Sequence, residues 1–314
     1  DLASGVELCV KMALQFLCNL AAACESNKAM IWDRYFSDAL MELVLSTKRH
    51  RRLLAFAIAL THSCCAGEES SARERLSALA SHKAFCCLLT EVVLHEQDDA
   101  FGWLEYLFAG FVRGGLHGEV VQSVGRAAEV GLRSVTPEQV IALRMLETVT
   151  EDEQELALAA EGGFGCWLVE ALEQLTNDVE ERSRDEMGMQ EEATDCVIRM
   201  TGRVLGSCKE EKRLEMVTVG GLLQWCLDLL ARCGSSSGNA HRASDITRLV
   251  GNACFRCSTA QDLVREHSGI PLLLQQGKFH PENGLTREWM LLAVRNLCEG
   301  NEANQRAVEE AKQQ

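Results

Sequence analysis

Residues 288–308 read EWMLLAVRNLCEGNEANQRAV, and this stretch decides the fold of the chain. Its apolar residues recur three and four positions apart, which predicts an amphipathic α-helix. Gly300 then ends the helix, because glycine readily adopts the left-handed conformation that follows a helix C-terminus. Asn301 is a candidate N-cap for a second, shorter helix. The stretch therefore predicts two consecutive helices that bury their apolar faces only by stacking against other elements.

Two other stretches repeat this pattern. Residues 16–31 read FLCNLAAACESNKAMI, and residues 249–264 read LVGNACFRCSTAQDLV. In all three stretches an asparagine lies toward the end of the apolar helix, namely Asn19, Asn252 and Asn296. The last two asparagines are 44 residues apart, which lies within the period of about 40–47 residues that armadillo and HEAT repeats show.

Weaker copies of the asparagine position fall at His62, near residue 105, at Glu147 and at Gly202. With the three asparagines they make about seven repeats, which occupy the chain and leave no room for a separate catalytic domain. The sequence therefore predicts an all-α fold, an armadillo/HEAT-like right-handed α-solenoid of about seven repeats.

Two polar stretches interrupt the repeats. Residues 176–193 (TNDVEERSRDEMGMQEEA) are highly charged and indicate an insertion, either a solvated extension of a helix or a flexible segment. Residues 233–245 (CGSSSGNAHRASD) are small and polar and predict a loop. We expect N-terminal repeats over residues 1–175 and C-terminal repeats over residues 194–314, joined in one continuous solenoid.

Composition narrows the possible partners. The formal net charge is −15 and the isoelectric point is near 5.1, whereas nucleic acids and anionic membranes are bound by clustered lysines and arginines. A basic or mixed-charge protein surface is the natural complement. No signal peptide opens the chain, and the longest unbroken apolar run, Leu53–Leu60, is too short to span a bilayer. We therefore expect a cytoplasmic protein that binds neither nucleic acid nor membranes.

The fifteen cysteines fall largely inside apolar helical stretches, where a free cysteine behaves as a small hydrophobic residue. Cys254 and Cys257 form a Cys-x-x-Cys pair, but no second pair or histidine pair lies at zinc-binding spacing. The sequence thus predicts reduced thiols, no metal and no cofactor. It also contains no Ser-His-Asp or phosphate-loop arrangement, so we do not expect an enzyme.

Several motifs point to a known family. They are Gly-Asn before Ala-Cys-Phe-Arg in 249–264, and a Gly-Ile-Pro-Leu-Leu turn followed by Glu-Trp, Arg-Asn-Leu and Asn-x-x-Asn-Gln in 269–308. Together they resemble the C-terminal armadillo region of the ataxin-10 family, and the resemblance covers residues 220–314. It implies a non-enzymatic cytoplasmic armadillo protein with links to cytokinesis, to ciliary or centrosomal structures and to neuronal survival.

Five residues are candidates for a partner-binding groove. Asn252 and Asn296 are placed to hydrogen-bond an extended peptide backbone, or else to cap the ends of their own helices. Trp289 and Arg295 are of the types that anchor protein interfaces, although Trp289 equally suits core packing. Arg256 completes the predicted groove set.

The predicted function is a scaffold that mediates protein–protein interactions through the concave face of the solenoid and its exposed ends. An alternative is a peptide-cargo adaptor of the transport-receptor type. Nuclear-import receptors of this fold pair a tryptophan with an asparagine four residues later, and no tryptophan here has that spacing. A regulatory subunit of an enzyme complex is a third possibility, and the oligomeric state is left open.

Overall fold

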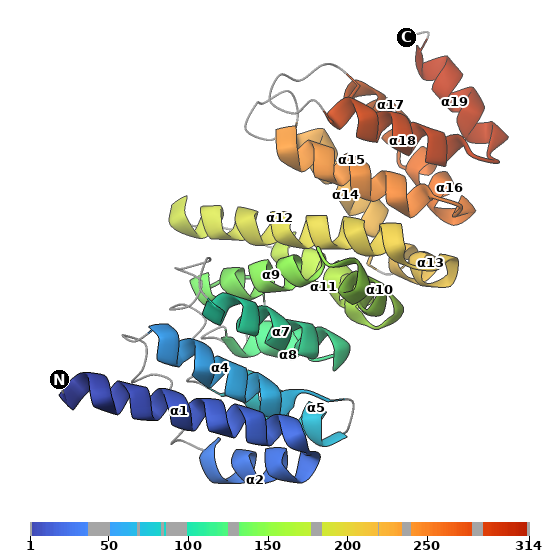
Figure 1. Cartoon of the computed structure of the whole chain (residues 1–314). Coiled ribbons are helices and arrows are strands. Elements are labelled where there is room, and N and C mark those ends of the chain that lie inside the picture. Colours follow the sequence, from blue (N-terminus) through green and yellow to red (C-terminus); the bar gives the residue numbers. More distant parts are fainter. Residues whose placement is uncertain are drawn as a thin grey trace. The chain divides into compact units, whose positions relative to one another are not determined.

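The computed structural model describes the chain over ten ranges, in which seventeen helices are found and no residue forms a strand (Figure 1). The predicted all-α class is therefore confirmed. The described ranges are residues 2–36, 51–67, 70–82, 85, 99–124, 132–176, 184–218, 220–233, 240–277 and 285–312.

The chain divides into two compact units. The N-terminal unit contains Asp1–Glu151 and Ser183–Met189, and the C-terminal unit contains Asp152–Arg182 and Gln190–Gln314. The helices of the N-terminal unit are α1 (Leu2–Ala23), α2 (Glu25–Tyr35), α4 (Arg51–Cys65), α5 (Ser70–Ala80), α7 (Asp99–Arg113), α8 (His117–Val124) and α9 (Pro137–Val149).

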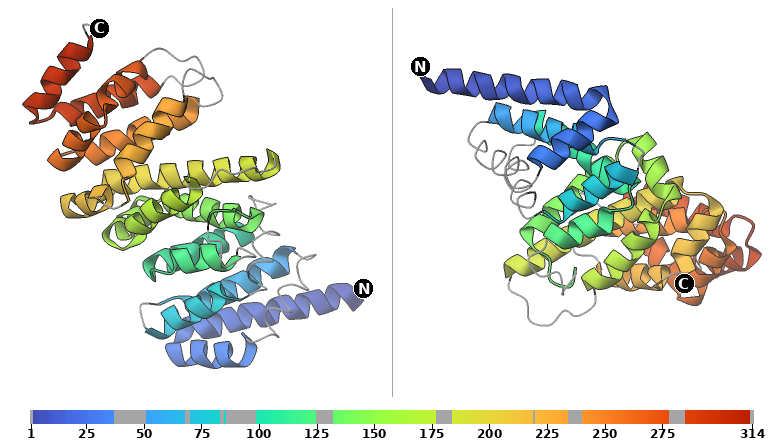
Figure 2. Two further views of the ribbon diagram at one scale, coloured as in Figure 1. Left: turned by 180° about the vertical axis from the view of Figure 1, so that it is seen from behind. Right: turned by 90° about the horizontal axis from the view of Figure 1, so that it is seen from below.

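The long helices of the N-terminal unit pack in chain order. Helix α1 contacts α4, α4 contacts α7, and α7 contacts α9, and Figure 2 shows α1, α4 and α7 side by side from behind. Helix α4 has the sequence RRLLAFAIALTHSCC and buries Leu54, Ala57 and Ile58 among others. A helix with a neighbour on each side needs apolar residues around most of its circumference, which explains this nearly continuous apolar run.

The C-terminal unit also contains long helices with shorter helices between them. Helix α12 starts at the boundary between the two units and belongs to this unit from Gln190 onward. The helices are α10 (Glu153–Glu161), α11 (Phe164–Thr176), α12 (Arg184–Ser207), α13 (Glu210–Thr218), α14 (Leu222–Cys233), α15 (Ala240–Cys254), α16 (Ser258–Glu266), α17 (Gly269–Gln275), α18 (Thr286–Cys298) and α19 (Glu302–Lys312).

The predicted repeat positions all fall on helices. The seven positions lie, in order, on α1, α4, α7, α9, α12, α15 and α18. A shorter helix follows each of these along the described chain, as the sequence of residues 288–308 predicts. The prediction of stacked helical repeats is confirmed within each unit.

Part of the polar segment 233–245 is helical, although the sequence predicts a loop there. Helix α15 begins at Ala240, so residues 240–245 form its first turns, whereas residues 234–239 lie outside the described residues. Arg242 in these turns pairs with Asp195 of α12 through Nε–Oδ1 and Nη2–Oδ2 distances of 2.5 and 3.1 Å. The partner is 47 residues away in sequence, so local composition does not reveal it.

The charged stretch 176–193 is helical from Arg184, where α12 begins, while residues 177–183 lie outside the described residues. Asp185, Glu186 and Met187 are exposed. The first turn of α12 is therefore exposed, whereas Gln190 and Ala193 further along the same stretch are buried. The insertion over 176–193 stays a prediction. The continuity of the solenoid across this stretch stays a prediction.

Helix α1 is the one described helix that is long and apolar enough to span a membrane. The apolar window is Gly5–Ala23, and 11% of it is buried. A search for unbroken apolar runs does not find it, because polar residues recur every fourth position, from Glu7 through Lys11. The helix packs against α4 and leaves Met12 and Phe16 62% and 65% exposed. The apolar character thus belongs to a helix that is covered by the described residues mainly on one side.

Candidate partner-binding face of the C-terminal unit

A buried arginine fixes the ends of two long helices. The last carbonyls of a helix have no partner within the helix, and Arg213 of α13, which is 4% exposed, supplies donors for them. Its Nη2 donates to the carbonyls of Leu205 and Cys208 at 3.1 and 2.9 Å. Its Nη1 donates to the carbonyl of Phe255 at 3.0 Å. One side chain therefore holds the C-terminal ends of α12 and α15 together.

Gln261 and Asn304 perform the same task one repeat later. Gln261 Nε2 on α16 donates to the carbonyls of Asn296 and Glu299 at 2.9 and 3.1 Å. Asn304 Nδ2 on α19 donates to the carbonyl of Leu297 at 2.9 Å. The two side chains are 3% and 0% exposed. Gln261 follows Asn252 by nine residues, and Asn304 follows Asn296 by eight. Both side chains satisfy carbonyl groups at the C-terminal end of a long helix.

The two C-terminal asparagines bridge neighbouring long helices. Asn252 Nδ2 donates to the carbonyl of Gly202 at 2.8 Å, and Asn296 Nδ2 donates to the carbonyl of Gly251 at 2.9 Å. Asn252 is half-buried and Asn296 is 5% exposed. Each amide thus bonds to the preceding long helix rather than to its own. Contact of these asparagines with a partner stays a prediction.

This hydrogen-bond pattern also corrects the alignment of the repeats. Gly202 and Gly251 both accept from the asparagine of the following long helix, so they occupy the same structural position. Arg203, and not Gly202, then corresponds to Asn252. The sequence places this repeat one residue too early, because the spacing between these two repeats is longer and no asparagine marks the position.

Trp289 connects α18 to α15. It is half-buried, and the Arg248 guanidinium carbon lies 5.5 Å from the centroid of its ring, within the range of a cation–π interaction. Arg248 Nη2 is also 3.8 Å from Asp245 Oδ1. Trp289 therefore serves packing between repeats while keeping part of its ring at the surface.

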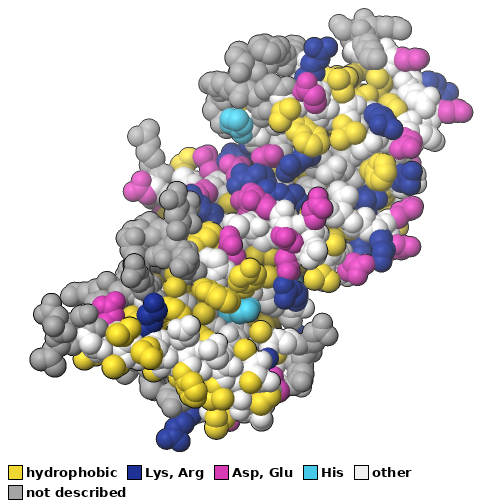
Figure 3. Space-filling view, viewed as in Figure 1, with side chains coloured by type: hydrophobic (Ala, Val, Ile, Leu, Met, Phe, Trp, Pro, Cys, Tyr) yellow, Lys and Arg dark blue, Asp and Glu magenta, His cyan; other side chains and the backbone are white. Residues whose placement is uncertain are grey.

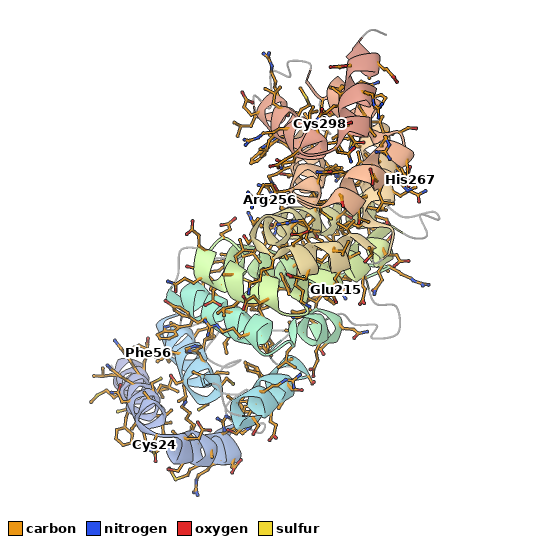
Figure 4. The ribbon with its side chains drawn as sticks, turned by 90° about the vertical axis from the view of Figure 1, so that its right-hand side faces the viewer. Cys24, Phe56, Glu215, Arg256, His267 and Cys298 are labelled. Atoms are coloured by element: carbon orange, nitrogen blue, oxygen red, sulfur yellow. The ribbon has the colours of Figure 1, made fainter. Side chains whose placement is uncertain are left out.

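Arg256 and Arg295 are the exposed members of the predicted set. Arg256 follows α15 with a φ of 51°, the left-handed conformation common directly after helices. Its guanidinium carbon lies 5.1 Å from the ring centroid of Phe255, which is 38% exposed. Figure 4 shows Arg256 on the opposite side of the C-terminal unit from His267. Sequence analysis did not single out Phe255, although an aromatic residue directly after a helix end is a usable signal.

The Cys254–Cys257 pair lies in the core. Both residues are buried, and burial raises the pKa of the Cys254 thiol, with the nearby thiols of Cys257 and Cys298 adding to the effect. Metal binding requires the thiolate, which this environment disfavours. Across the described ranges, no group of three or more His, Cys, Asp or Glu side chains is arranged to hold a metal ion.

Residues 243–314 match the family model described as the spinocerebellar ataxia type 10 protein domain. The resemblance to the ataxin-10 family is confirmed. The matched residues include α16 to α19 and most of α15, and thus Gln261, Asn296 and Asn304. Residues 243–314 of the C-terminal unit are therefore helical repeats that are similar in sequence to this domain.

Individual relatives show how far the similarity extends. Ataxin-10 of Homo sapiens is 37% identical over 71 residues, which are 23% of this chain and 15% of that protein. The ataxin-10 homolog of Dictyostelium discoideum is 37% identical over 68 residues, 22% of this chain and 11% of that protein. Ataxin-10 of Xenopus tropicalis is 23% identical over 329 residues, 95% of this chain and 63% of that protein. The matched part of the chain therefore spans less than two thirds of each of these relatives.

Two solved structures match most of the chain at low sequence identity. An engineered protein matches with a TM-score of 0.39 and 14% identity, over 96% of this chain and 88% of that chain. A designed armadillo repeat protein in complex with the peptide (KR)4 matches with a TM-score of 0.36 and 13% identity, over 91% and 92%.

Proposed function

We propose that the chain is a non-enzymatic scaffold for protein partners, and that its C-terminal unit binds them through exposed residues of α18 and the end of α15. These residues are Phe255, Arg256, Leu291 and Arg295, here called the α15–α18 face. Phe255 and Leu291 are 38% and 57% exposed, and both arginines are exposed. Aromatic and arginine side chains are enriched among residues that dominate binding energy. Large apolar groups exposed beside arginines are the observation that carries the proposal.

The backbone beneath this face is firmly held. Gln261 Nε2 donates to the carbonyl of Cys254 at 3.3 Å as well as to those of Asn296 and Glu299 on α18. The ends of α15 and α18 therefore meet at one buried side chain. A surface that is already ordered loses less conformational entropy when it binds. This supports a preorganised docking face.

The charge of the chain indicates the kind of partner. The chain carries a formal charge of −15, while the α15–α18 face contributes two exposed arginines, Arg256 and Arg295. Complementary charges speed association and select partners. We therefore propose a protein partner of mixed charge, with acidic groups opposite the two arginines and basic groups around them.

The peptide-cargo alternative receives less support from the hydrogen bonds. An adaptor that grips an extended peptide needs side-chain donors directed at the peptide backbone. The amide nitrogens of Asn252 and Asn296 instead donate to the carbonyls of Gly202 and Gly251. This favours docking of a folded surface over capture of an extended peptide in the predicted groove.

The family resemblance extends the proposal in one respect. On that resemblance alone, we propose that the partners belong to cytokinesis and to ciliary or centrosomal structures, that they include proteins of neuronal survival, and that the chain meets them in the cytoplasm.

The test compares variants of the full chain in an affinity purification with quantitative mass spectrometry. The test variant is Leu291→Ser with Arg295→Glu, and the matched control is Arg306→Glu, a charge reversal at an exposed arginine on α19. We expect the test variant to reduce the recovery of specific partners at least tenfold, while the control retains them. Both variants should keep the thermal midpoint of the parent.

Asn296→Ala distinguishes binding from folding. Because the buried Asn296 donates to the carbonyl of Gly251, we expect this variant to lower the thermal midpoint. If the double variant recovers the same partners as the parent at an unchanged midpoint, the α15–α18 face is not the binding face.

A further inference from the structure

The N-terminal unit contains a cavity of about 450 Å³ that the proposed function does not use. It lies where the end of α4 and the turn after it meet α5 and α7. The residues that matter for its chemistry are His62, Cys65, Arg73, Tyr106 and Arg113. Small-molecule pockets in proteins typically measure about 300–1,000 Å³. The cavity is therefore large enough to accept a few side chains of another protein.

An aromatic cluster borders the cavity. The ring centroids of His62 and Trp103 are 5.5 Å apart, those of His62 and Tyr106 are 5.6 Å apart, and those of Trp103 and Tyr106 are 5.7 Å apart. Tyr106 is 58% exposed and Trp103 is half-buried. Figure 3 shows hydrophobic side chains gathered over α4 and α7. Partly exposed aromatic rings of this kind provide contact area for an apolar side chain at low entropic cost.

The described wall of the cavity carries two arginines, although the chain as a whole is acidic. The exposed Arg73 is held by its Nε, which donates to the carbonyl of Gly114 at 3.0 Å, and Arg113 lines the same cavity. Among the described residues that line the cavity, none is Asp or Glu. Burial lowers the pKa of His62, and the positive charges of Arg113 and Lys28 lower it further. The same charges that disfavour a protonated histidine favour an anion.

We propose that this cavity binds an acidic side chain of a partner protein, with an adjacent apolar side chain packed against His62, Trp103 and Tyr106. Arginine forms charge-assisted hydrogen bonds with carboxylates, and Arg73 and Arg113 both border the cavity. The aromatic cluster favours a partner segment in which a large apolar side chain lies close to the acidic residue. The ligand is thus a short surface segment that presents Asp or Glu close to Phe, Trp or Leu.

This site is independent of the α15–α18 face, because the two lie in different units. Failure of one proposal therefore leaves the other standing. Glu68 and Glu69 follow Gly67 of the cavity wall and lie outside the described residues. The experiment accordingly uses the intact chain, in which any competition from these carboxylates is included in the measured affinity.

The probe is an array of eight-residue peptides that place one Asp or Glu one to four positions from one Phe, Trp or Leu in a Gly-Ser background. A matched array carries Asn or Gln in place of the acid. We expect the labelled full chain to bind acidic members at least tenfold more strongly than their amide counterparts. Binding should weaken as salt increases, because partly exposed charges are screened.

Two variants test the two halves of the site. Arg113→Glu should abolish the preference for acidic peptides, and Tyr106→Ala should weaken binding of the apolar neighbour at least tenfold. Arg34→Glu reverses an exposed charge on α2 and serves as the matched control, which should bind as the parent does. Equal binding of acidic and amide peptides, or equal losses in Arg34→Glu and Arg113→Glu, overturns the proposal. Tyr106 is largely exposed, so its variant stays informative if Arg113→Glu does not fold.

Discussion

Two glycines in the same structural position should respond to alanine in opposite directions. Gly202 on α12 and Gly251 on α15 are both buried and both accept from an asparagine of the next long helix. A Cβ atom at Gly251 would lie 3.0 Å from both Cα and Cβ of Ala293. A Cβ atom at Gly202 would lie 3.7 Å from its nearest neighbours, which include Cα and Cβ of Leu249. The first contact is too close and involves backbone, whereas the second is ordinary packing.

The magnitudes follow from two competing effects. Alanine is favoured over glycine in a helix interior by about 0.8–1.0 kcal/mol. Nothing opposes this at Gly202, so Gly202→Ala should stabilise the C-terminal unit by roughly 0.5–1 kcal/mol. At Gly251 the added methyl forces α15 and α18 apart, and overpacking costs about 1–3 kcal/mol. Gly251→Ala should therefore destabilise the unit by roughly 0.5–2 kcal/mol.

Thermal unfolding followed by circular dichroism measures both effects. A change of 1 kcal/mol moves the midpoint by about 2–4 °C in a unit of this size, so the variants should shift in opposite directions by a few degrees. Stacked repeats often unfold in more than one step, so the sign of each shift is the decisive result. Shifts of the same sign would refute the argument that the separation of α15 and α18 requires glycine at position 251.

Two further predictions concern buried charge. Arg213→Met removes the donors to the carbonyls of Leu205, Cys208 and Phe255, and should lower the free energy of unfolding in urea by on the order of 2–4 kcal/mol. The control is Lys212→Met at the half-buried neighbouring residue, which should change stability by no more than about 0.5 kcal/mol. A comparable loss in both variants would contradict the role of Arg213. Burial lowers the pKa of His117 to about 4, below the roughly 6.5 expected in the unfolded chain. As the pH falls, the unfolded state therefore binds the proton before the folded state does, so the stability present above pH 6.5 falls by up to about 3 kcal/mol toward pH 4. His117→Gln should reduce this loss when urea unfolding is measured as a function of pH. Parallel pH profiles of parent and variant would exclude His117 as its cause.

Repeat positions were predictable because they depend on local chemistry. The asparagines and the apolar spacing around them placed seven helices that the structure contains. The acceptors of those asparagines were not predictable, because Gly202 and Gly251 lie 50 and 45 residues away in sequence. The first turns of α15 were not predictable for the same reason, since Arg242 in these turns pairs with Asp195 of α12, which is 47 residues away in sequence. Sequence reasoning therefore named Asn252 and Asn296 as groove candidates without revealing that their amide groups bond to the preceding long helix. It did not name Phe255 or Leu291.

The residue that precedes each bridging asparagine differs between a helix on which the next long helix packs and a helix on which none packs. In α15 this residue is Gly251, and Ala293 of α18 packs directly on it. In α18 the corresponding residue is Arg295, which is exposed, and no described helix covers it. An arginine at this position prevents another helix from approaching as closely as α18 approaches α15. A partner at the α15–α18 face would therefore lie further from α18 than α18 lies from α15, and would contact the charged Arg295 beside the apolar Leu291. This favours a partner surface with polar groups over another helix of the same stack.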